Sequence, residues 1–450
     1  MPSDLDRPLA ETVTSTVMVP FEGTGGGVAE LSWGQAEIWT TIVHQESWMP
    51  IGGPAELLLA KTLDEIVAAL GWMLGRHRAL RARMRFESGG GVRQEVAGRG
   101  EAPLLVVDVA DDGDPARVAA DVDAEFRRPD FDHEHDFPLR MAVVRHRGVL
   151  THLVIEFCHV AVDGDGMVAL FRTGLGELLL TDVDAAALPV THTLDPVDQV
   201  DWQRGPAGRR HNLAVQRYWS RQLARVPAGR FGPTDDERRP RHWLAVMRSP
   251  AAYRAMWSIA TRAAVDSSTV LLAAAATATV RATGRGPAVF QIVVGNRFRP
   301  GLADSVSAIA QSCVCVIDVA DVAFDEVLAR ATRSARNAYL NGYFDRGQME
   351  TMIAKLGAER GEHIDLTCFF NDRRAPANRE PGRTAPTDET TITWGPHSDT
   401  PFEPLFVHFN DTADAVVELQ LEVDTRYFPP AHMETFMREF QTTLLAAASL

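Results

Sequence analysis

The chain has 450 residues, more than one hydrophobic core usually serves, so two domains or two similar lobes are expected. With 45% hydrophobic and 23% charged residues, it should fold as an ordinary globular protein. Its formal net charge of −15 argues against nucleic acid or an anionic membrane surface as a partner.

The N-terminal stretch has acidic residues where a signal peptide needs basic ones, and it lacks a continuous apolar segment. We interpret residues 1–28, which are polar and contain a Gly-rich run, as a flexible leader. The most apolar helical stretch, residues 270–280, is too short to cross a bilayer. These features predict a cytoplasmic protein that does not associate with a membrane.

Four cysteines lie in apolar contexts without the paired spacing of a zinc site: Cys158, Cys313, Cys315 and Cys368. This pattern is typical of buried thiols in a reducing compartment. Cys313 and Cys315, two residues apart, should lie on the same side of an apolar strand and belong to the core. We expect no bound metal.

In the first half, Thr62 and Glu65 form a capping box that predicts a helix to about Leu80. The glycines of residues 86–96 predict a hairpin, and the strand at 104–109 is followed by a helix over 114–126. Two further strands are expected, the second of them ending near His159. Helical periodicity follows after Gly166.

Residues 181–229 are rich in Asp, Pro, Gly and Arg, so the lobe boundary is placed there, with an N-terminal lobe over 29–190 and a C-terminal lobe over 191–450. The second half again mixes both element types. Helices are expected over 267–283, 324–340 and 432–447, and strands near 288–295, 312–319, 365–371, 406–411 and 415–424. This alternation predicts an α/β or α+β architecture of two similar lobes.

The stretch CHVAVDGDG, residues 158–166, is the strongest candidate for chemistry. Histidine has the unperturbed pKa nearest neutrality and is the most frequent general base. A strand that delivers His159 into a tight loop closed by Asp163 and Gly164 would fix the ring and let a ligand approach the backbone. Taken alone, however, the same residues suit a buried histidine before a turn.

The surrounding segments, in their order, resemble the condensation domains of nonribosomal peptide synthetases, members of the chloramphenicol acetyltransferase-like superfamily. The central signature, His-His-x-x-x-Asp-Gly, corresponds to residues 158–164, with Cys158 in place of the first histidine. Other segments are similar in the same order: LSWGQAEIW (31–39), RHRALRARM (76–84), FDHEHDFPLR (131–140), RYWSRQL (217–223) and VVGNR (293–297).

The resemblance implies a role for each residue of the signature. His159 inherits the catalytic position, and Gly164 would present a backbone amide beside the reacting centre. Asp163 inherits a structural role, with Arg297 as the candidate partner that helps to hold the loop. Cys158 would fill a packing site.

The resemblance also implies two chloramphenicol acetyltransferase-like lobes in a V, with the active site in a tunnel between them. The expected enzyme is an acyltransferase of natural-product biosynthesis that joins a carrier-bound acyl or aminoacyl thioester to an amine or alcohol. The thioester would be presented on the phosphopantetheine arm of a peptidyl or acyl carrier protein, with no permanently bound cofactor. The N-terminal leader suggests a freestanding enzyme or the opening domain of a protein, and family members often act as monomers.

Two other functions fit the same motif. One is an alcohol O-acyltransferase of the polyketide-associated type that uses coenzyme A or carrier thioesters. The other is a non-catalytic interaction domain of an assembly line. Such domains typically lose the second histidine or the glycine of the signature, so His159 and Gly164 favour an enzyme.

Overall fold

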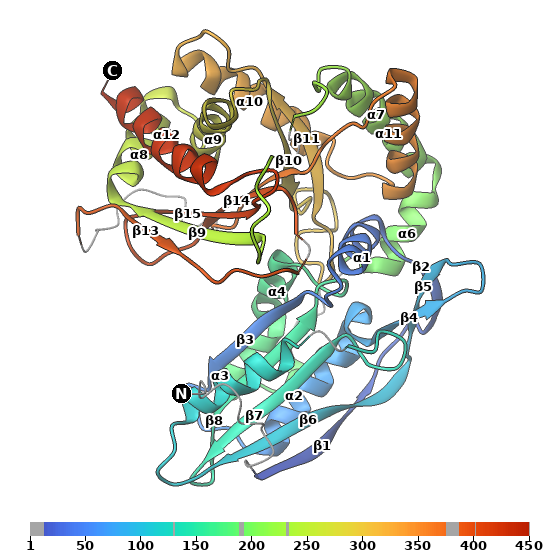
Figure 1. Ribbon diagram of the computed structural model, residues 1–450. Helices are drawn as coiled ribbons and strands as arrows, with labels where there is room; N and C mark the ends of the chain where they lie inside the picture. The colour runs from blue at the N-terminus through green and yellow to red at the C-terminus, as the bar shows by residue number, and fades with distance from the viewer. Residues whose placement is uncertain are drawn as a thin grey trace. The chain divides into compact units, whose positions relative to one another are not determined.

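The computed structural model describes residues 13–128, 131–188, 193–230, 234–374, 387–400 and 402–449. The chain divides into two compact units (Figure 1). Unit 1 contains the described residues up to Arg209 together with the segment Gly295–Ala310, and unit 2 contains Arg210–Val294 with the described residues from Gln311 on. The lobe boundary predicted between residues 190 and 191 lies outside the described residues.

Unit 1 is built on a five-stranded sheet in the order β1-β6-β7-β8-β3 and a three-stranded sheet in the order β2-β5-β4. Its strands are β1 (Val13–Glu22), β2 (Gly27–Glu30), β3 (Pro50–Glu56), β4 (Ala82–Phe86), β5 (Val92–Val96), β6 (Arg99–Val109), β7 (Leu139–His146) and β8 (Val149–Cys158). Its helices are α1 (Trp33–Gln45), α2 (Leu63–Arg76), α3 (Pro115–Phe126), α4 (Gly164–Leu170), α5 (Gly176–Leu180) and α6 (Pro196–Arg204), with short 3-10 or π turns at Arg78–Arg81, Phe171–Leu175 and Ala185–Ala187.

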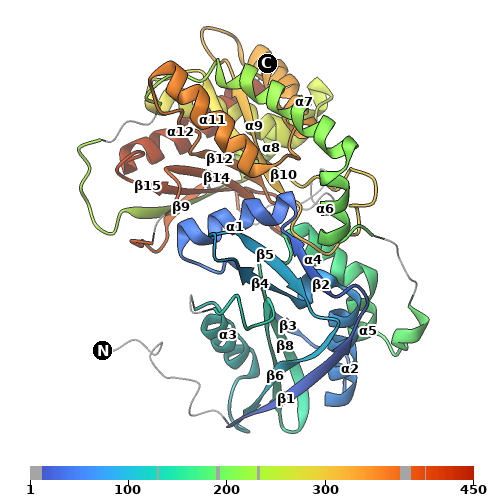
Figure 2. The same ribbon diagram turned by 90° about the vertical axis from the view of Figure 1, so that its right-hand side faces the viewer.

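Helices cover both faces of the larger sheet of unit 1, as Figure 2 shows for α2 and α3. On one face, Leu70 of α2 packs with Leu104 of β6 and Ile155 of β8. On the other face, Val122 of α3 packs with Val154 of β8. Alternate residues of β8 therefore enter two different cores, because successive side chains of a strand point to opposite faces.

Unit 2 has a seven-stranded sheet in the order β11-β10-β12-β14-β15-β9-β13. Its strands are β9 (His242–Ser249), β10 (Ala288–Val294), β11 (Gln311–Ile317), β12 (Cys368–Asp372), β13 (Thr391–Trp394), β14 (Leu405–Asn410) and β15 (Val417–Asp424). Its helices are α7 (Pro206–Leu223), which begins in unit 1, α8 (Pro250–Ala263), α9 (Ser267–Thr283), α10 (Phe324–Leu340), α11 (Arg346–Arg360) and α12 (Pro430–Ala448). Helices α8, α9, α10 and α12 contribute to one buried core with the sheet (Figure 1).

The predicted α/β class is confirmed, and several element boundaries agree closely. The Thr62–Glu65 capping box begins α2, although the helix ends at Arg76 rather than near Leu80. The helices predicted over 267–283 and 324–340 are α9 and α10. All four cysteines are buried and none of them forms a disulfide, and Cys313 and Cys315 lie on the fully buried strand β11.

The flexible leader predicted over residues 1–28 is wrong for Val13–Glu22, while residues 1–12 lie outside the described residues. Val13–Glu22 forms β1 and pairs with β6 from Val13↔Asp108 to Glu22↔Arg99. Val19 and Phe21 are both buried in the unit 1 core. The pairing partner lies far along the chain, so polar composition alone hid the strand.

Candidate functional site in unit 1

Strands β8 and β3 together position His159. His159 follows directly after β8, whose last residue, Cys158, lies opposite Pro50 of β3. The backbone N–H of His159 donates to the carbonyl oxygen of Met49, at 3.2 Å. Met49 has a φ of 50°, in the left-handed region, so the chain turns sharply just before β3. Its place directly after β8 and its hydrogen bond to Met49 thus fix the backbone of His159.

The imidazole ring of His159 is held in one orientation by its own loop. Nδ1 lies 3.0 Å from the carbonyl oxygen of Val162. A carbonyl oxygen can only accept, so Nδ1 must carry the proton and the neutral ring has its lone pair on Nε2. The residue is partly exposed, and Nε2 has no hydrogen-bond partner in the described part of the chain. This arrangement can accept a proton at Nε2.

Cys158 is a packing residue. Its side chain is fully buried in a cluster with Ile42, Trp48, Met84 and Val160. Its Sγ donates to the carbonyl oxygen of Trp48, at 3.2 Å, and burial raises the pKa of the thiol to about 12. The thiol is therefore protonated at neutral pH and unsuited to nucleophilic attack.

Asp163 is buried, and its two carboxylate oxygens accept four hydrogen bonds. Oδ1 accepts from the N–H of Gly166 at 2.7 Å, which caps α4, and from Nη2 of Arg297 at 2.5 Å. Oδ2 accepts from the backbone N–H groups of Ile309 and Ala310, at 2.8 and 3.0 Å. None of these donors belongs to His159, so the carboxylate holds the loop and does not touch the imidazole.

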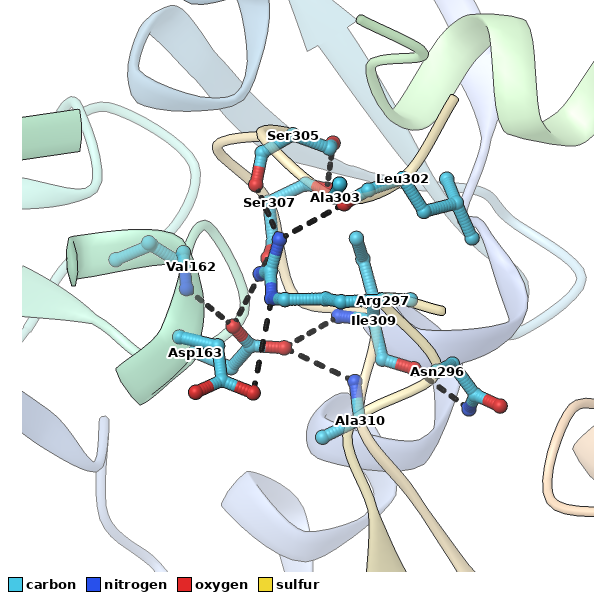
Figure 3. Close-up of polar contacts among 12 residues, drawn as sticks. Val162, Asp163, Asn296, Arg297, Leu302, Ala303, Ser305, Ser307, Ile309 and Ala310 are labelled. Atoms are coloured by element: carbon cyan, nitrogen blue, oxygen red, sulfur yellow. Dashed lines mark hydrogen bonds and ion pairs between the residues drawn. The ribbon is translucent and has the colours of Figure 1, made fainter. Parts of the chain in front are cut away.

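Arg297 lies in a socket of carbonyl oxygens beside this carboxylate (Figure 3). Nη1 donates to the carbonyls of Leu302 (3.2 Å) and Ser305 (2.6 Å), and Nη2 also donates to that of Ser307 (3.1 Å). Only 12% of the Arg297 side chain and 5% of the Asp163 side chain are exposed, so solvent screens their ion pair little. The structure thus brings together the predicted pair.

The two glycines of the DGDG turn differ in their surroundings. A Cβ added to Gly164 would meet only Cδ1 of Ile51, at 3.9 Å, and the residue is exposed. A Cβ on Gly166 would lie 2.7 Å from Val162 Cγ2 and 2.9 Å from both Arg297 Nη2 and the Ser307 carbonyl oxygen. Gly166 is therefore the glycine that packing requires, and sequence reasoning did not assign it a role, although its place in the turn was a signal.

The segment Gly295–Ala310 carries a second layer of contacts that sequence reasoning missed. Ser305 and Ser307 are fully buried, and their hydroxyls lie 2.8 Å apart. Nε2 of Gln199, on α6, donates to the Ser307 hydroxyl at 3.0 Å, and the Ser305 hydroxyl donates to the Leu194 carbonyl at 2.6 Å. These contacts fix the loop whose carbonyls hold Arg297.

The segment LSWGQAEIW supplies structure rather than chemistry. Ser32 and Gln35 form a capping box at the start of α1. Gln35 also exchanges side-chain hydrogen bonds with the buried Gln94 of β5, at 2.9 and 3.3 Å. A Cβ on Gly34 would collide with the Ala308 carbonyl oxygen. This motif therefore supports the same segment, Gly295–Ala310.

The segment RHRALRARM is likewise structural. Arg78 forms ion pairs with Asp195 and Asp198 at the start of α6. His77 is buried, and burial, assisted by Arg76 and Arg81, lowers its pKa to about 3. His77 is thus neutral and enclosed at physiological pH.

In the described ranges, no three or more His, Cys, Asp or Glu residues are grouped so that they could hold a metal ion. In the same ranges no single helix is long and apolar enough to span a membrane, although the bent pair α8 and α9 passes that test together by length and composition.

Comparisons with known proteins point in one direction. A family model described as "Condensation domain" matches residues 54–450. A nonribosomal peptide synthetase, penN of Penicillium thymicola, is 27% identical over 344 residues, which cover 71% of this chain and 12% of the relative. The chain therefore spans only a small part of that relative's length.

Two solved structures illustrate the similarity of the fold. SgcC5 from Streptomyces globisporus, in complex with (R)-(-)-1-(2-naphthyl)-1,2-ethanediol and sucrose, has a TM-score of 0.70 at 19% identity, over 94% of this chain and 99% of that one. The epimerization domain from the third module of tyrocidine synthetase B also has a TM-score of 0.70, at 13% identity, over 95% of this chain and 98% of that one. The fold alone does not select one reaction within this group.

Proposed function

Because the chain belongs to the condensation-domain family, we propose that it transfers an acyl or aminoacyl group from a carrier-bound thioester to an amine or alcohol, with His159 as general base. The observation that carries this proposal is the bond from His159 Nδ1 to the Val162 carbonyl, which leaves the lone pair at Nε2 available. The product would be an amide or an ester in natural-product biosynthesis.

The chemistry follows from the groups present. The acceptor nitrogen or oxygen attacks the thioester carbonyl carbon while Nε2 of His159 removes its proton. The carbon–sulfur bond then breaks, and the thiolate leaves readily because a thiol pKa is near ~8.5. The proton taken up by Nε2 can pass to that thiolate, so the ring returns to its starting state.

Gly164 is proposed to donate its backbone N–H to the oxyanion of the tetrahedral intermediate. As the first residue of α4, its N–H has no carbonyl partner within the helix. Its open surroundings leave room for a substrate to approach the backbone closely. Asp163, whose oxygens are occupied by four other donors, acts as a positioning residue together with Arg297.

Both amines and alcohols are kept as acceptors. The similar structure of SgcC5 holds a diol, a ligand that offers hydroxyl groups and no amine, and this supports an alcohol acceptor here. An alcohol needs a general base more than an amine does, because its lone pair is less nucleophilic while the proton is in place. The free Nε2 of His159 suits that requirement.

The expected partner is an acyl or peptidyl carrier protein whose phosphopantetheine arm presents the thioester, with no permanent cofactor. The tunnel between the lobes, the lobe boundaries and the monomeric state stay predictions. An interaction domain without catalysis would have no use for a histidine whose ring is fixed with Nε2 free.

Mass spectrometry of products tests the proposal. Wild type, His159→Ala and the control His135→Ala, whose histidine is 75% exposed in a loop, are incubated with one acylated carrier protein and paired amine and alcohol acceptors. Product from wild type and His135→Ala, but not from His159→Ala, is expected. Product with free acyl-coenzyme A alone would favour the O-acyltransferase, and no product from any donor would favour an interaction domain.

A further inference from the structure

Unit 2 carries a concentration of arginines that the proposed chemistry does not use. The part of α7 that lies in unit 2 contains Arg210, Arg217 and Arg221 and no acidic residue. Helix α10 adds Arg330, Arg333 and Arg336.

A cavity of about 380 Å³ lies between α7, α10 and the end of β11. Three guanidinium groups line it, those of Arg225, Arg330 and Arg333, against one carboxylate, that of Asp318. The hydroxyl group of Ser334 and the side-chain amides of Gln222 and Asn337 also line the cavity. Several cations around one cavity form an arrangement that recognises an anion.

The three arginines are not equally neutralised. Arg330 is held by Asp318 and by Glu326, with Nε 2.9 Å from Glu326 Oε1. Arg333 lies 3.7 Å from the same Glu326 oxygen, and 65% of its side chain is exposed. Arg225 donates to the Gln222 side-chain oxygen at 3.1 Å and forms no ion pair within the described ranges. Arg225 and Arg333 therefore leave positive charge available to a ligand.

Arg225 follows the C-terminal end of α7, where a cation stabilises the helix dipole. The helix dipole therefore explains the position of Arg225. It does not explain the position of Arg333, which lies on α10 and lines the same cavity.

A second cavity, of about 800 Å³, is lined by the same Arg225 and Asp318. Beyond them its wall combines the apolar side chains of Val319, Val322 and Phe324 with polar and charged ones, among them Arg281 and Asp321. Because the two cavities share Arg225 and Asp318, together they form one groove, in which the arginines of the first cavity adjoin the apolar side chains of Val319 and Val322 in the second.

We propose that this groove binds a small phosphate monoester with an apolar substituent. The phosphate lies between Arg225 and Arg333, where two guanidinium groups can each donate paired hydrogen bonds to its oxygens. The apolar substituent lies along Val319 and Val322. This binding site lies within unit 2 and is independent of the His159 chemistry.

Isothermal titration calorimetry of the full chain tests the proposal with three probes: n-hexyl phosphate, inorganic phosphate and n-hexanol. We expect hexyl phosphate to bind at least roughly 10-fold more tightly than phosphate, because burying a few methylene groups contributes that much. Hexanol should give no measurable binding. Affinity for hexyl phosphate should fall between 50 and 200 mM salt, since the contact is ionic.

Variants separate this site from nonspecific attraction. Arg225→Gln combined with Arg333→Gln should weaken hexyl phosphate binding at least roughly 10-fold, as expected when two charged hydrogen-bond donors are removed. The matched control is Arg217→Gln, which removes one exposed charge from the same helix α7 outside the cavity wall and should leave affinity unchanged. If the double variant unfolds, the binding of hexyl phosphate is measured with Arg225→Gln or Arg333→Gln alone.

Three results would overturn the proposal. They are no binding of hexyl phosphate to wild type, equal affinity in the variants with altered cavity arginines, and hexyl phosphate binding no more tightly than phosphate.

Discussion

At the scale of single residues, His159 and Asp163 have different surroundings. His159 is fixed through Nδ1 and keeps Nε2 free, whereas Asp163 next to it is enclosed by four donors. If its partners were removed, the buried carboxylate of Asp163 would lower the stability of the fold by several kcal/mol. Asp163 and Arg297 thus maintain the loop that presents the histidine.

Replacing Asp163 by alanine should destabilise the protein by about 3–5 kcal/mol, because Arg297 and three backbone amides lose their acceptor. Urea unfolding measures this effect as a lower midpoint at unchanged slope. Arg297→Ala should behave in the same way. A variant that unfolds at the wild-type midpoint yet has lost all activity would instead indicate that Asp163 takes part in the chemistry.

Gly164 and Gly166 allow the packing requirement at one glycine to be tested separately from the proposed catalytic role of the other. Gly166→Ala should cost about 1–3 kcal/mol of stability, because its Cβ would meet three neighbours at 2.7–2.9 Å. Gly164→Ala should unfold at the wild-type midpoint but reduce the rate of acyl transfer, because in the proposed mechanism the substrate approaches the backbone there. Similar stabilities for the two variants would contradict this reading of the turn.

At the scale of elements, the site depends on segments that meet from distant parts of the chain. His159 follows β8, its backbone N–H donates to Met49 just before β3, and Gly295–Ala310 supplies the amides and carbonyls around Asp163 and Arg297. Arg127, the C-cap residue of α3, donates to the fully buried Glu156 of β8 at 2.6 Å and to the Gly52 carbonyl of β3 at 3.0 Å. These contacts tie α3 to the two strands that hold His159.

The pH dependence of the free energy of unfolding should reveal the burial of Glu156 beside Arg127. Burial, together with the carboxyl group of Asp123, raises the pKa of Glu156 from 4.5 to about 8, although Arg127 opposes the shift. The folded state therefore keeps a proton that the unfolded state releases, so stability falls as pH rises from about 4.5 to about 8. Urea midpoints across this range should show that decline in wild type and a weaker one in Glu156→Gln. Parallel curves would exclude Glu156 as its source.

Local signals made some of these elements predictable. The capping box at Thr62, the extent of α9 and α10, and the strand leading to His159 all follow from residues close together in the sequence. Strand β1 and the Ser305–Ser307 layer were missed because their partners are far away in the chain. The pairing of Asp163 with Arg297 was reached through the family resemblance and not from spacing.

At the scale of the whole molecule, the two units have separate cores and different surfaces. Unit 1 carries the histidine site, and unit 2 carries the arginine-lined groove. Membership of the condensation-domain family accounts for the order of the motifs along the chain. Motif residues outside the signature make structural contacts in both units: Gln35 and Arg78 in unit 1, and Trp219 in the core of unit 2.

The four cysteines give a test of the folded state as a whole. Burial raises the pKa values of Cys158, Cys315 and Cys368 to about 12, and Cys313 is also fully buried. Because only thiolates react rapidly, a disulfide reagent such as Ellman's should label none of them in the native protein and all four in urea. Fast labelling of a native thiol would show that its core opens.

The most direct test of the central claim is the rate of acyl transfer from an acylated carrier protein by wild type and His159→Ala. The loss of one hydrogen bond to Val162 should change stability by only about 1 kcal/mol, so both proteins can be compared in the folded state. We predict that the variant is at least ~100-fold slower, the usual scale for loss of a general base. An unchanged rate in a folded variant would contradict the assignment of His159 as the catalytic base.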